Sequence, residues 1–235
     1  ILREKELHCP TGDFLLGEKE DGRVLPLDEV RLLSPTIPSK ALCIGLNYRD
    51  HAEEMMLKLP ETPVVFLKPG TAVIAAGEAI RSPALSRQVD FEGELAVVIG
   101  KKAKQISETE AGKYIFGYSC ANDVTARDLQ SRQGQWTVAK GFDTFLPYGP
   151  WIETEVEPSA LEIRTLLNGK ERQRSNTRNL IFSVFYLVSY LSHVMTLLPG
   201  DLILTGTPSG VGPMQPGDHV TVEISGIGSL TNPIL

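Results

Sequence analysis

Two glutamates and one aspartate are the residues of this sequence most suited, by type and spacing, to form a catalytic or metal-binding site. Glu92 and Glu94 lie in the stretch VDFEGELAVVIG, residues 89–100. This stretch predicts a β-strand, because its second half is apolar and β-branched and it ends on glycine. Alternate residues of a strand share a face, which places the two glutamates side by side, roughly 7 Å apart. Like charges at this spacing repel, and burial increases the repulsion. A proton, a basic side chain or a metal ion must therefore compensate them.

Asp123 supplies the third carboxylate, where a second predicted strand turns into a polar segment in the stretch YSCANDVTAR. Three carboxylates from two strand ends predict a site built from oxygen ligands. Such a site favours hard cations such as Mg2+, Mn2+ or Ca2+ over Zn2+. The spacing alone leaves a second interpretation open, because a Glu-x-Glu pair is more often a solvated strand face.

His51 and Glu54 form a second candidate pair. They are three residues apart in a segment, residues 49–59, that predicts a short helix ended by Pro60. Residues three apart share a helix face. A carboxylate beside a histidine orients the ring and stabilises its charged form, so the pair can draw a proton from water. An exposed polar helix face is the alternative interpretation.

Basic and amide side chains form a third candidate group: Lys68, Arg127, Gln130 and Lys140. Lys140 follows an apolar run, residues 136–139, that we interpret as a strand, and such a position is unusual for a solvated charge. These side chains could offset the carboxylates or bind an anionic substrate. A surface location of the lysines is the alternative.

A glycine-rich loop, TGTPSGVG at residues 205–212, contains Thr207. Loops of this kind can offer backbone N–H groups and a hydroxyl to an anion. The loop lacks the lysine pattern of a P-loop, so nucleotide binding is not indicated. A tight connection without a ligand is the alternative.

The surrounding elements are mostly strands. Strands are predicted over residues 40–48, 63–68 and 201–206, and hairpins over residues 163–172, with Asn168-Gly169 at the tip, and 219–233. A buried helix is predicted from a Ser183 cap to the Pro199-Gly200 stop. We expect an α+β fold, predominantly β. We also expect two parts, a small N-terminal β appendage over residues 1–37 and a catalytic domain over residues 38–235.

Composition sets outer bounds. The chain has 235 residues, of which 42% are hydrophobic and 22% charged, enough for a sizeable core. The net charge of −6 and the lack of a basic cluster argue against nucleic acid as a partner. The three cysteines are far apart and indicate reduced thiols. With no signal peptide visible, we expect a cytoplasmic protein without a membrane partner.

Six motifs occur in an order that resembles the fumarylacetoacetate hydrolase superfamily. They are IGLNYRDHAEE at 44–54, FLKP at 66–69, DFEGELAVVIGK at 90–101, NDVTARDLQ at 122–130, AKGFD at 139–143 and LTGTPSGVG at 204–212. The resemblance covers residues from about 38 to 235. It implies the mixed β-sandwich roll of this family's C-terminal domain and a homodimer.

The resemblance also implies roles for the matching positions. The metal ligands would be Glu92, Glu94 and Asp123, with Mg2+ or Mn2+ bound and Ca2+ as a further candidate. The catalytic residues would be His51 and Glu54, on a mobile lid helix, together with Lys140. The substrate would be held by Lys68, Arg127, Gln130 and Thr207.

The predicted function is metal-dependent cleavage of a C–C bond in a small 2,4-dioxo acid or 2-oxo diacid. This means acylpyruvate hydrolysis or oxaloacetate decarboxylation, through a metal-bound enolate. The alternative is an isomerase, or isomerase/decarboxylase, of an unsaturated 2-oxo diacid such as 5-carboxymethyl-2-hydroxymuconate. A binding module with a structural Ca2+ would leave the His-x-x-Glu pair and Lys140 without a purpose.

Overall fold

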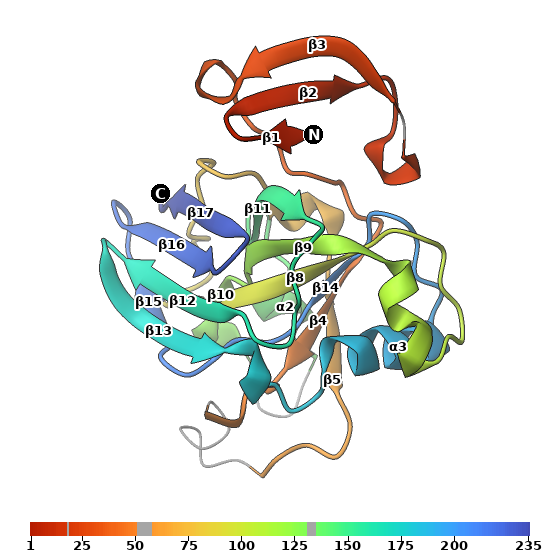
Figure 1. Ribbon diagram of the computed structural model, residues 1–235. Coiled ribbons are helices and arrows are strands. Elements are labelled where there is room, and N and C mark those ends of the chain that lie inside the picture. The colour runs from red at the N-terminus through yellow and green to blue at the C-terminus, as the bar shows by residue number, and fades with distance from the viewer. Residues whose placement is uncertain (18, 51–57, 131–134) are drawn as a thin grey trace.

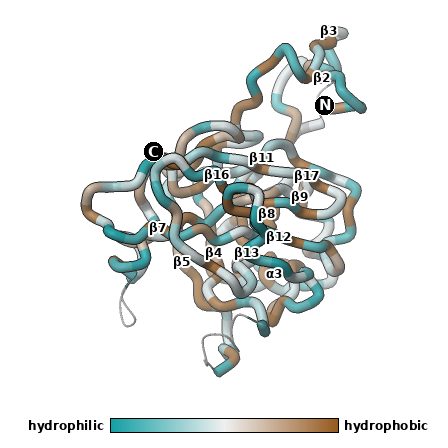
Figure 2. The backbone as a smooth tube through the Cα atoms, turned by 90° about the vertical axis from the view of Figure 1, so that its left-hand side faces the viewer, coloured by the Kyte–Doolittle hydropathy of each residue, from teal (hydrophilic) through white to brown (hydrophobic). Residues whose placement is uncertain are grey.

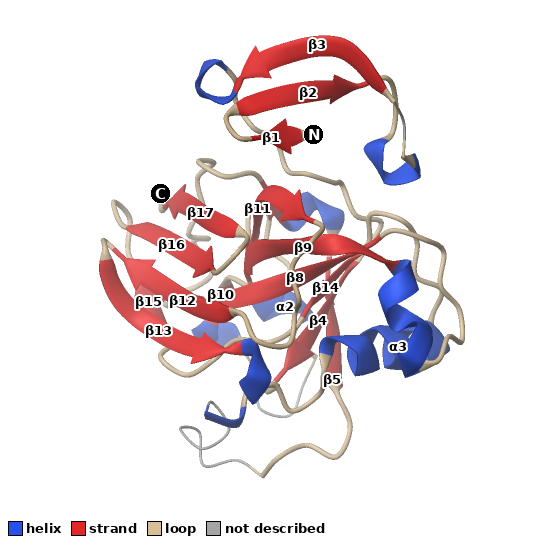
Figure 3. Cartoon of the chain, viewed as in Figure 1, coloured by secondary structure: helices blue, strands red, loops and turns tan. Residues whose placement is uncertain are grey.

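Strands dominate the described residues (Figure 3), and there they form four sheets. The computed structural model describes residues 1–17, 19–50, 58–130 and 135–235 (Figure 1). The largest sheet is mixed and seven-stranded, in the order β5-β4-β14-β8-β9-β11-β6. Its strands are β4 Ala41–Gly45, β5 Val64–Lys68, β6 Val73–Ile74, β8 Gly93–Ile99, β9 Ile115–Asn122, β11 Leu146–Glu153 and β14 Leu202–Leu204. The pairs β4/β14 and β6/β11 are parallel, and the other pairs are antiparallel.

Three smaller sheets complete the strand framework. A four-stranded antiparallel sheet contains β12 Glu162–Leu167, β13 Lys170–Asn176, β16 His219–Ile224 and β17 Gly228–Pro233. A short sheet contains β7 Val89–Phe91, β10 Thr125–Ala126 and β15 Gly212–Met214. The N-terminal sheet contains β1 Leu2–Arg3, β2 Glu6–Pro10 and β3 Glu20–Pro26. The predicted α+β, predominantly β fold class is therefore confirmed, and so are both predicted hairpins.

Helices are few in the described residues. The α-helices are α2 Thr137–Lys140 and α3 Val184–Val194, and the 3-10 helices are Phe14–Leu16, Leu27–Glu29, Gly70–Ala72, Glu108–Tyr114, Arg127–Leu129 and Thr177–Asn179. Ser183 caps α3 as predicted, because its side chain accepts from the backbone N–H of Tyr186. The predicted end at Pro199-Gly200 is wrong, since Met195 is already extended. No described helix is long and apolar enough to cross a membrane.

The main core lies between one face of the large sheet, the helix α3 and the four-stranded sheet. Members from these three layers include Leu95, Val97 and Ile99, then Leu187 and Leu191, then Ile163 and Val222. A second cluster of smaller residues covers the opposite face of the large sheet, among them Cys43, Ala96, Ala121 and Leu204. The strands β4 and β5 stand out as apolar segments in Figure 2. The large sheet is therefore buried on both faces.

The N-terminal sheet lies apart from the other sheets, at the top of Figure 1. The 3-10 helix between β2 and β3 contacts the rest, for example through Phe14, whose ring meets that of Phe116 edge to face with centroids 5.6 Å apart. This arrangement fits the expected β appendage, and the division at residues 1–37 and 38–235 stays a prediction. The three cysteines are free thiols, as expected.

Two predicted strands near the carboxylates are corrected. Residues 89–100 form two strands, β7 and β8, which belong to different sheets. The chain changes sheets at Glu92, whose backbone N–H bonds the Asn122 side chain at 2.9 Å. The interpretation of residues 136–140 as a strand is wrong, because residues 137–140 form the single helical turn α2. Residues 51–57 lie outside the described part of the chain, so the predicted helix at 49–59 is not tested.

Candidate active site

Glu92, Glu94 and Asp123 come together as predicted. One carboxylate oxygen from each residue lies within 4.8 Å of those of the other two. All three residues are buried, with exposed fractions of 7%, 1% and 1%. Glu92 stands between β7 and β8, Glu94 lies in β8, and Asp123 directly follows β9. The site therefore forms where two neighbouring strands end side by side.

Backbone hydrogen bonds fix these positions. The Asp123 N–H donates to the Glu92 carbonyl oxygen at 2.8 Å, which ties the two strand ends together. From the loop after β14, the Gly206 N–H donates to Glu94 Oε2 at 2.7 Å. Gly206 has a φ of +97°, and a Cβ there would lie 2.8 Å from the Cβ of Asn47. Glycine thus lets this loop approach closely enough to hold Glu94.

The ammonium groups of two lysines lie among the carboxylates and donate hydrogen bonds to them. Lys140 donates to Glu92 Oε2 at 2.8 Å and to Asp123 Oδ2 at 2.6 Å. Lys68 donates to Asp123 Oδ1 at 2.5 Å and to the carbonyl oxygen of Val124 at 2.8 Å. The two lysines are 2% and 1% exposed, which excludes the alternative of surface lysines. They offset the carboxylates, which is one of the two roles that the sequence left open, and substrate binding stays a prediction.

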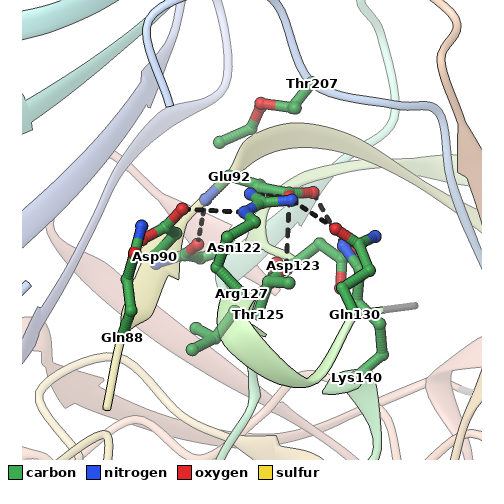
Figure 4. Close-up of polar contacts among 12 residues, drawn as sticks. Gln88, Asp90, Glu92, Asn122, Asp123, Thr125, Arg127, Gln130, Lys140 and Thr207 are labelled. Atoms are coloured by element: carbon green, nitrogen blue, oxygen red, sulfur yellow. Dashed lines mark hydrogen bonds and ion pairs between the residues drawn. The ribbon is translucent and has the colours of Figure 1, made fainter. Parts of the chain in front are cut away.

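Arg127 forms the other side of the cluster (Figure 4). Its Nη2 donates to Glu92 Oε1 at 2.5 Å, its Nε to Asp90 Oδ2 at 2.8 Å and its Nη1 to Gln130 Oε1 at 2.6 Å. Asp90 is buried, and no role was predicted for it from the sequence. Its position two residues before Glu92 is the feature of the sequence that could have indicated a role in the site. Arg127 keeps 27% of its side chain exposed, so solvent and ligands still reach it.

The pKa values of the glutamates diverge. Burial raises the pKa of Glu94 well above its usual range, and the charges of Asp123 and Glu92 raise it further. Burial acts in the same direction on Glu92, but Lys140 and Arg127 outweigh it and lower that pKa to about 2. The same carboxylates outweigh burial at Lys140 and raise its pKa. Glu92 and Lys140 therefore favour their charged forms, whereas Glu94 holds its proton more strongly than a free carboxyl group does.

The donor set fits a hard divalent cation. Among the described residues, four carboxylates gather here, those of Asp90, Glu92, Glu94 and Asp123, together with the three cations Lys68, Lys140 and Arg127, which contact all of them except Glu94. One negative charge is left over when all four carboxylates are ionised. Carboxylate oxygens without thiolate or imidazole suit Mg2+, Mn2+ or Ca2+. Glu92, Glu94 and Asp123 would hold such an ion, and the resulting excess positive charge would attract an anionic substrate.

Thr207 lies beside the cluster, but its hydroxyl is engaged in the fold. It donates to the Gly93 carbonyl oxygen at 2.9 Å and accepts from Gln173 Nε2 at 2.8 Å. Gln173 also accepts from the Gly93 N–H at 3.0 Å. Thr207 and Gln173 thus anchor the glycine-rich loop to β8. Gln173 was not predicted from the sequence, because it lies in no recognisable motif.

Most of the predicted site residues therefore meet in one cluster: Lys68, Glu92, Glu94, Asp123, Arg127, Gln130 and Lys140, with Thr207 at its edge. His51 and Glu54 lie outside the described residues. Their predicted catalytic role stays a prediction.

The chain is similar to known proteins of one family. The family model of the fumarylacetoacetate (FAA) hydrolase C-terminal domain matches residues 40–235. The mitochondrial oxaloacetate tautomerase Fahd2a of Rattus norvegicus is 40% identical over 224 residues, which span 90% of this chain and 72% of the rat protein.

Two solved structures are similar over nearly the whole chain. The first is 2-hydroxyhepta-2,4-diene-1,7-dioate isomerase from Mycobacterium marinum, with a TM-score of 0.92 and 48% identity over 98% of this chain and 87% of that one. The second is 5-carboxymethyl-2-hydroxymuconate delta-isomerase from Mycobacterium smegmatis. It has a TM-score of 0.87 and 52% identity over 92% of this chain and 86% of that one.

Proposed function

Because the chain belongs to the fumarylacetoacetate hydrolase family, we propose that it is a divalent-metal-dependent enzyme acting on small 2-oxo acids that carry a second carbonyl or carboxylate group. The chemistry would pass through an enol or enolate of the substrate. The observation that supports this proposal most is the cluster of buried carboxylates that lie close together, two of which accept hydrogen bonds from Lys140. A cation bound there would supply positive charge to the oxygens of the substrate.

Lys140 would stabilise the negative charge that develops on the substrate oxygen. Its raised pKa keeps it protonated, so it acts as a hydrogen-bond donor and not as a base. Because it is already held by Glu92 and Asp123, little reorganisation is needed during the reaction. This role is the same whether the enolate arises by removal of a proton or by cleavage of a C–C bond.

Arg127 and Gln130 would orient the substrate carboxylate. The guanidinium is held by Asp90 and Glu92 but remains partly exposed, which suits a group that binds an anion from solution. Guanidinium groups bind carboxylates with defined geometry. Gln130 accepts one N–H of Arg127 through Oε1, so its amide nitrogen would be the atom that donates to a substrate oxygen.

Two reaction classes remain within this proposal. The names of the relatives favour tautomerisation or isomerisation of 2-oxo diacids. The family name and the predicted His51–Glu54 dyad favour cleavage of a C–C bond by activated water, as in acylpyruvate hydrolysis. Oxaloacetate decarboxylation needs only the stabilised enolate.

A substrate panel separates these classes. The enzyme would be assayed with Mg2+ and Mn2+ on acylpyruvates, oxaloacetate and an unsaturated 2-oxo diacid, with products identified by NMR. Glu54→Gln should suppress acylpyruvate hydrolysis by about 10²–10⁴-fold, because hydrolysis needs a base, and should spare decarboxylation. No turnover of any of these compounds with either metal would contradict the proposed function.

We also propose a homodimer as the functional form, on the basis of the family resemblance. Sedimentation velocity at micromolar concentration would test it, and a monomer at the concentrations used in the assays would refute it.

A further inference from the structure

Two aromatic side chains border the cluster beside Lys140. The Lys140 ammonium lies 5.0 Å from the centroid of the Phe66 ring. The Phe66 and Trp136 rings meet edge to face, with centroids 5.2 Å apart and planes at 67°. We call this pair of rings the aromatic wall. It begins one side chain away from the metal-binding carboxylates, since Lys140 itself contacts Glu92 and Asp123.

The fold ties the aromatic wall to Lys140. Trp136 is the N-cap of α2 and Lys140 is its last residue, and the Lys140 N–H donates to the Trp136 carbonyl oxygen at 2.9 Å. Phe66 lies on β5, two residues before Lys68, so both side chains face the same side of the sheet. The wall and both lysines are thus positioned by the same two elements.

Glycine at position 45 makes room for the indole. Gly45 pairs with Val64 across β4 and β5. A Cβ on Gly45 would lie 2.6 Å and 2.8 Å from two carbons of the Trp136 ring, so the ring rests directly on the glycine backbone. Any larger residue would displace the indole.

Both rings are partly exposed, whereas a comparable ring nearby is not. Phe145 lies 5.9 Å from the Lys68 ammonium, but it is completely buried and belongs to the core. Phe66 and Trp136 are half-buried and so can contact a ligand that enters beside Lys140. Apolar and aromatic surface in such a place favours an apolar or planar group and gives no counter-charge to a carboxylate.

We propose that the aromatic wall packs against the part of the substrate beyond C4, and that Phe66 and Trp136 therefore select 2-oxo acids with an apolar or unsaturated chain there. This inference rests on the proposed function, because C1 to C4 of the substrate are placed by the carboxylates, Lys140 and Arg127. Oxaloacetate ends at C4 and would not reach the wall.

The first test compares substrates of different length. The quantity is the ratio of kcat/KM for 4-phenyl-2,4-dioxobutanoate to that for oxaloacetate. Trp136→Leu and Phe66→Leu should each lower this ratio roughly tenfold, since loss of apolar contact in a pocket typically changes specificity by that order. Tyr190→Leu is the matched control, because it removes an aromatic ring stacked on Tyr186 in α3, on the other face of the sheet. It should leave the ratio unchanged.

A smaller substitution covers the case in which loss of a ring destabilises the protein. Gly45→Ala keeps both rings but pushes the indole aside, and it should shift the same ratio while the melting temperature stays close to that of the wild type. An equal loss of kcat/KM for both substrates in Trp136→Leu, Phe66→Leu and Gly45→Ala would overturn the proposal. The wall would then only support Lys140.

The second test does not need turnover. Trp151 is the second of the two tryptophans, and Trp151→Phe leaves Trp136 as the only indole. With Mg2+ bound, phenylpyruvate should change the Trp136 emission and oxalate, which lacks a chain, should not. Equal responses to both ligands would overturn the aromatic wall as a binding surface. If the wild type turns over no member of the substrate panel, the proposed function fails, and this emission change still decides whether the wall contacts the chain.

Discussion

At the scale of single residues, the site is defined by how buried charges are matched. Glu92 and Asp123 each have both carboxylate oxygens bonded to cationic side chains, whereas Glu94 receives a backbone N–H from Gly206. Buried charges without partners cost several kcal/mol each. Glu94, which lacks a cationic partner among the described residues, is therefore the carboxylate that gains most from a bound metal.

Removal of the Glu94 carboxylate tests the metal site. Glu94→Gln should abolish most Mg2+ or Mn2+ affinity and activity, because a neutral amide oxygen is a weaker ligand for a hard cation. Asp90→Asn is a matched control, a buried carboxylate that faces Arg127 and lies outside the trio. It should retain metal binding. Isothermal titration calorimetry would measure both affinities, and full activity of Glu94→Gln in a chelator would exclude the site.

Lys140→Met separates metal binding from catalysis. The variant removes a positive charge beside Glu92 and Asp123, so affinity for the divalent cation should stay the same or increase. Activity should fall by about 10²–10³-fold, as for the loss of an oxyanion donor. Titration with Mn2+ and steady-state kinetics at saturating metal would check both values. A parallel loss of affinity and activity would instead indicate a structural role for Lys140.

Metal binding should depend on pH through Glu94. Its raised pKa means that Glu94 in the metal-free protein keeps its proton to higher pH than a free carboxyl group does, and a metal ligand must be deprotonated. Binding should therefore release a proton, and affinity should increase as pH rises toward the pKa of Glu94. Calorimetry in two buffers of different ionisation enthalpy measures the released proton. In Glu94→Gln, the weak metal binding that remains should release no such proton.

At the scale of elements, the loop after β14 holds Glu94. Gly206→Ala would place a Cβ against Asn47 at a φ of +97°, so the loop must shift and its hydrogen bond to Glu94 weaken. Metal affinity should fall roughly tenfold, in line with the loss of a hydrogen bond to a charged group.

Gly169→Ala provides the matched control for that glycine. Gly169 also has a positive φ, +74°, but a Cβ there meets nothing within 4 Å, and its neighbour Asn168 bonds Asp218 and the backbone of His219, which lie outside the cluster. This variant should cost about 1 kcal/mol of folding free energy and leave metal affinity unchanged. Equal effects of the two variants on metal affinity would show that the loop does not position Glu94.

At the scale of the whole molecule, the metal should stabilise the fold by mass action. At a concentration of 100 times Kd, the ion would add about 2.7 kcal/mol to the free energy of unfolding. For a chain of this size the melting temperature should rise by roughly 5–10 °C. Differential scanning calorimetry with EDTA and with Mn2+ would measure it. Glu94→Gln should lose most of this increase, and an increase of the same size in that variant would indicate binding elsewhere.

Features that depend on near neighbours along the chain could be predicted from the sequence. The Asn168-Gly169 tip and the Ser183 cap follow from turn chemistry and capping. The spacing of two residues predicted that Glu92 and Glu94 lie close together, although Glu92 stands between two strands and not on one. The order of the six motifs indicated the family.

The pairing of the buried charges, and the position at which the chain passes from one sheet to another, became clear from the three-dimensional structure. Lys68 meets Asp123 across 55 positions of sequence, and Gly206 meets Glu94 across 112. Residue spacing along one strand or helix cannot predict contacts over such separations in sequence. The break between β7 and β8 at Glu92 and the helical turn that ends at Lys140 also arise from contacts with distant segments. The side chain of Asn122 binds the backbone of Glu92, and α2 is held at β5 and β10, so contacts with distant segments override the local preference for a continuous strand.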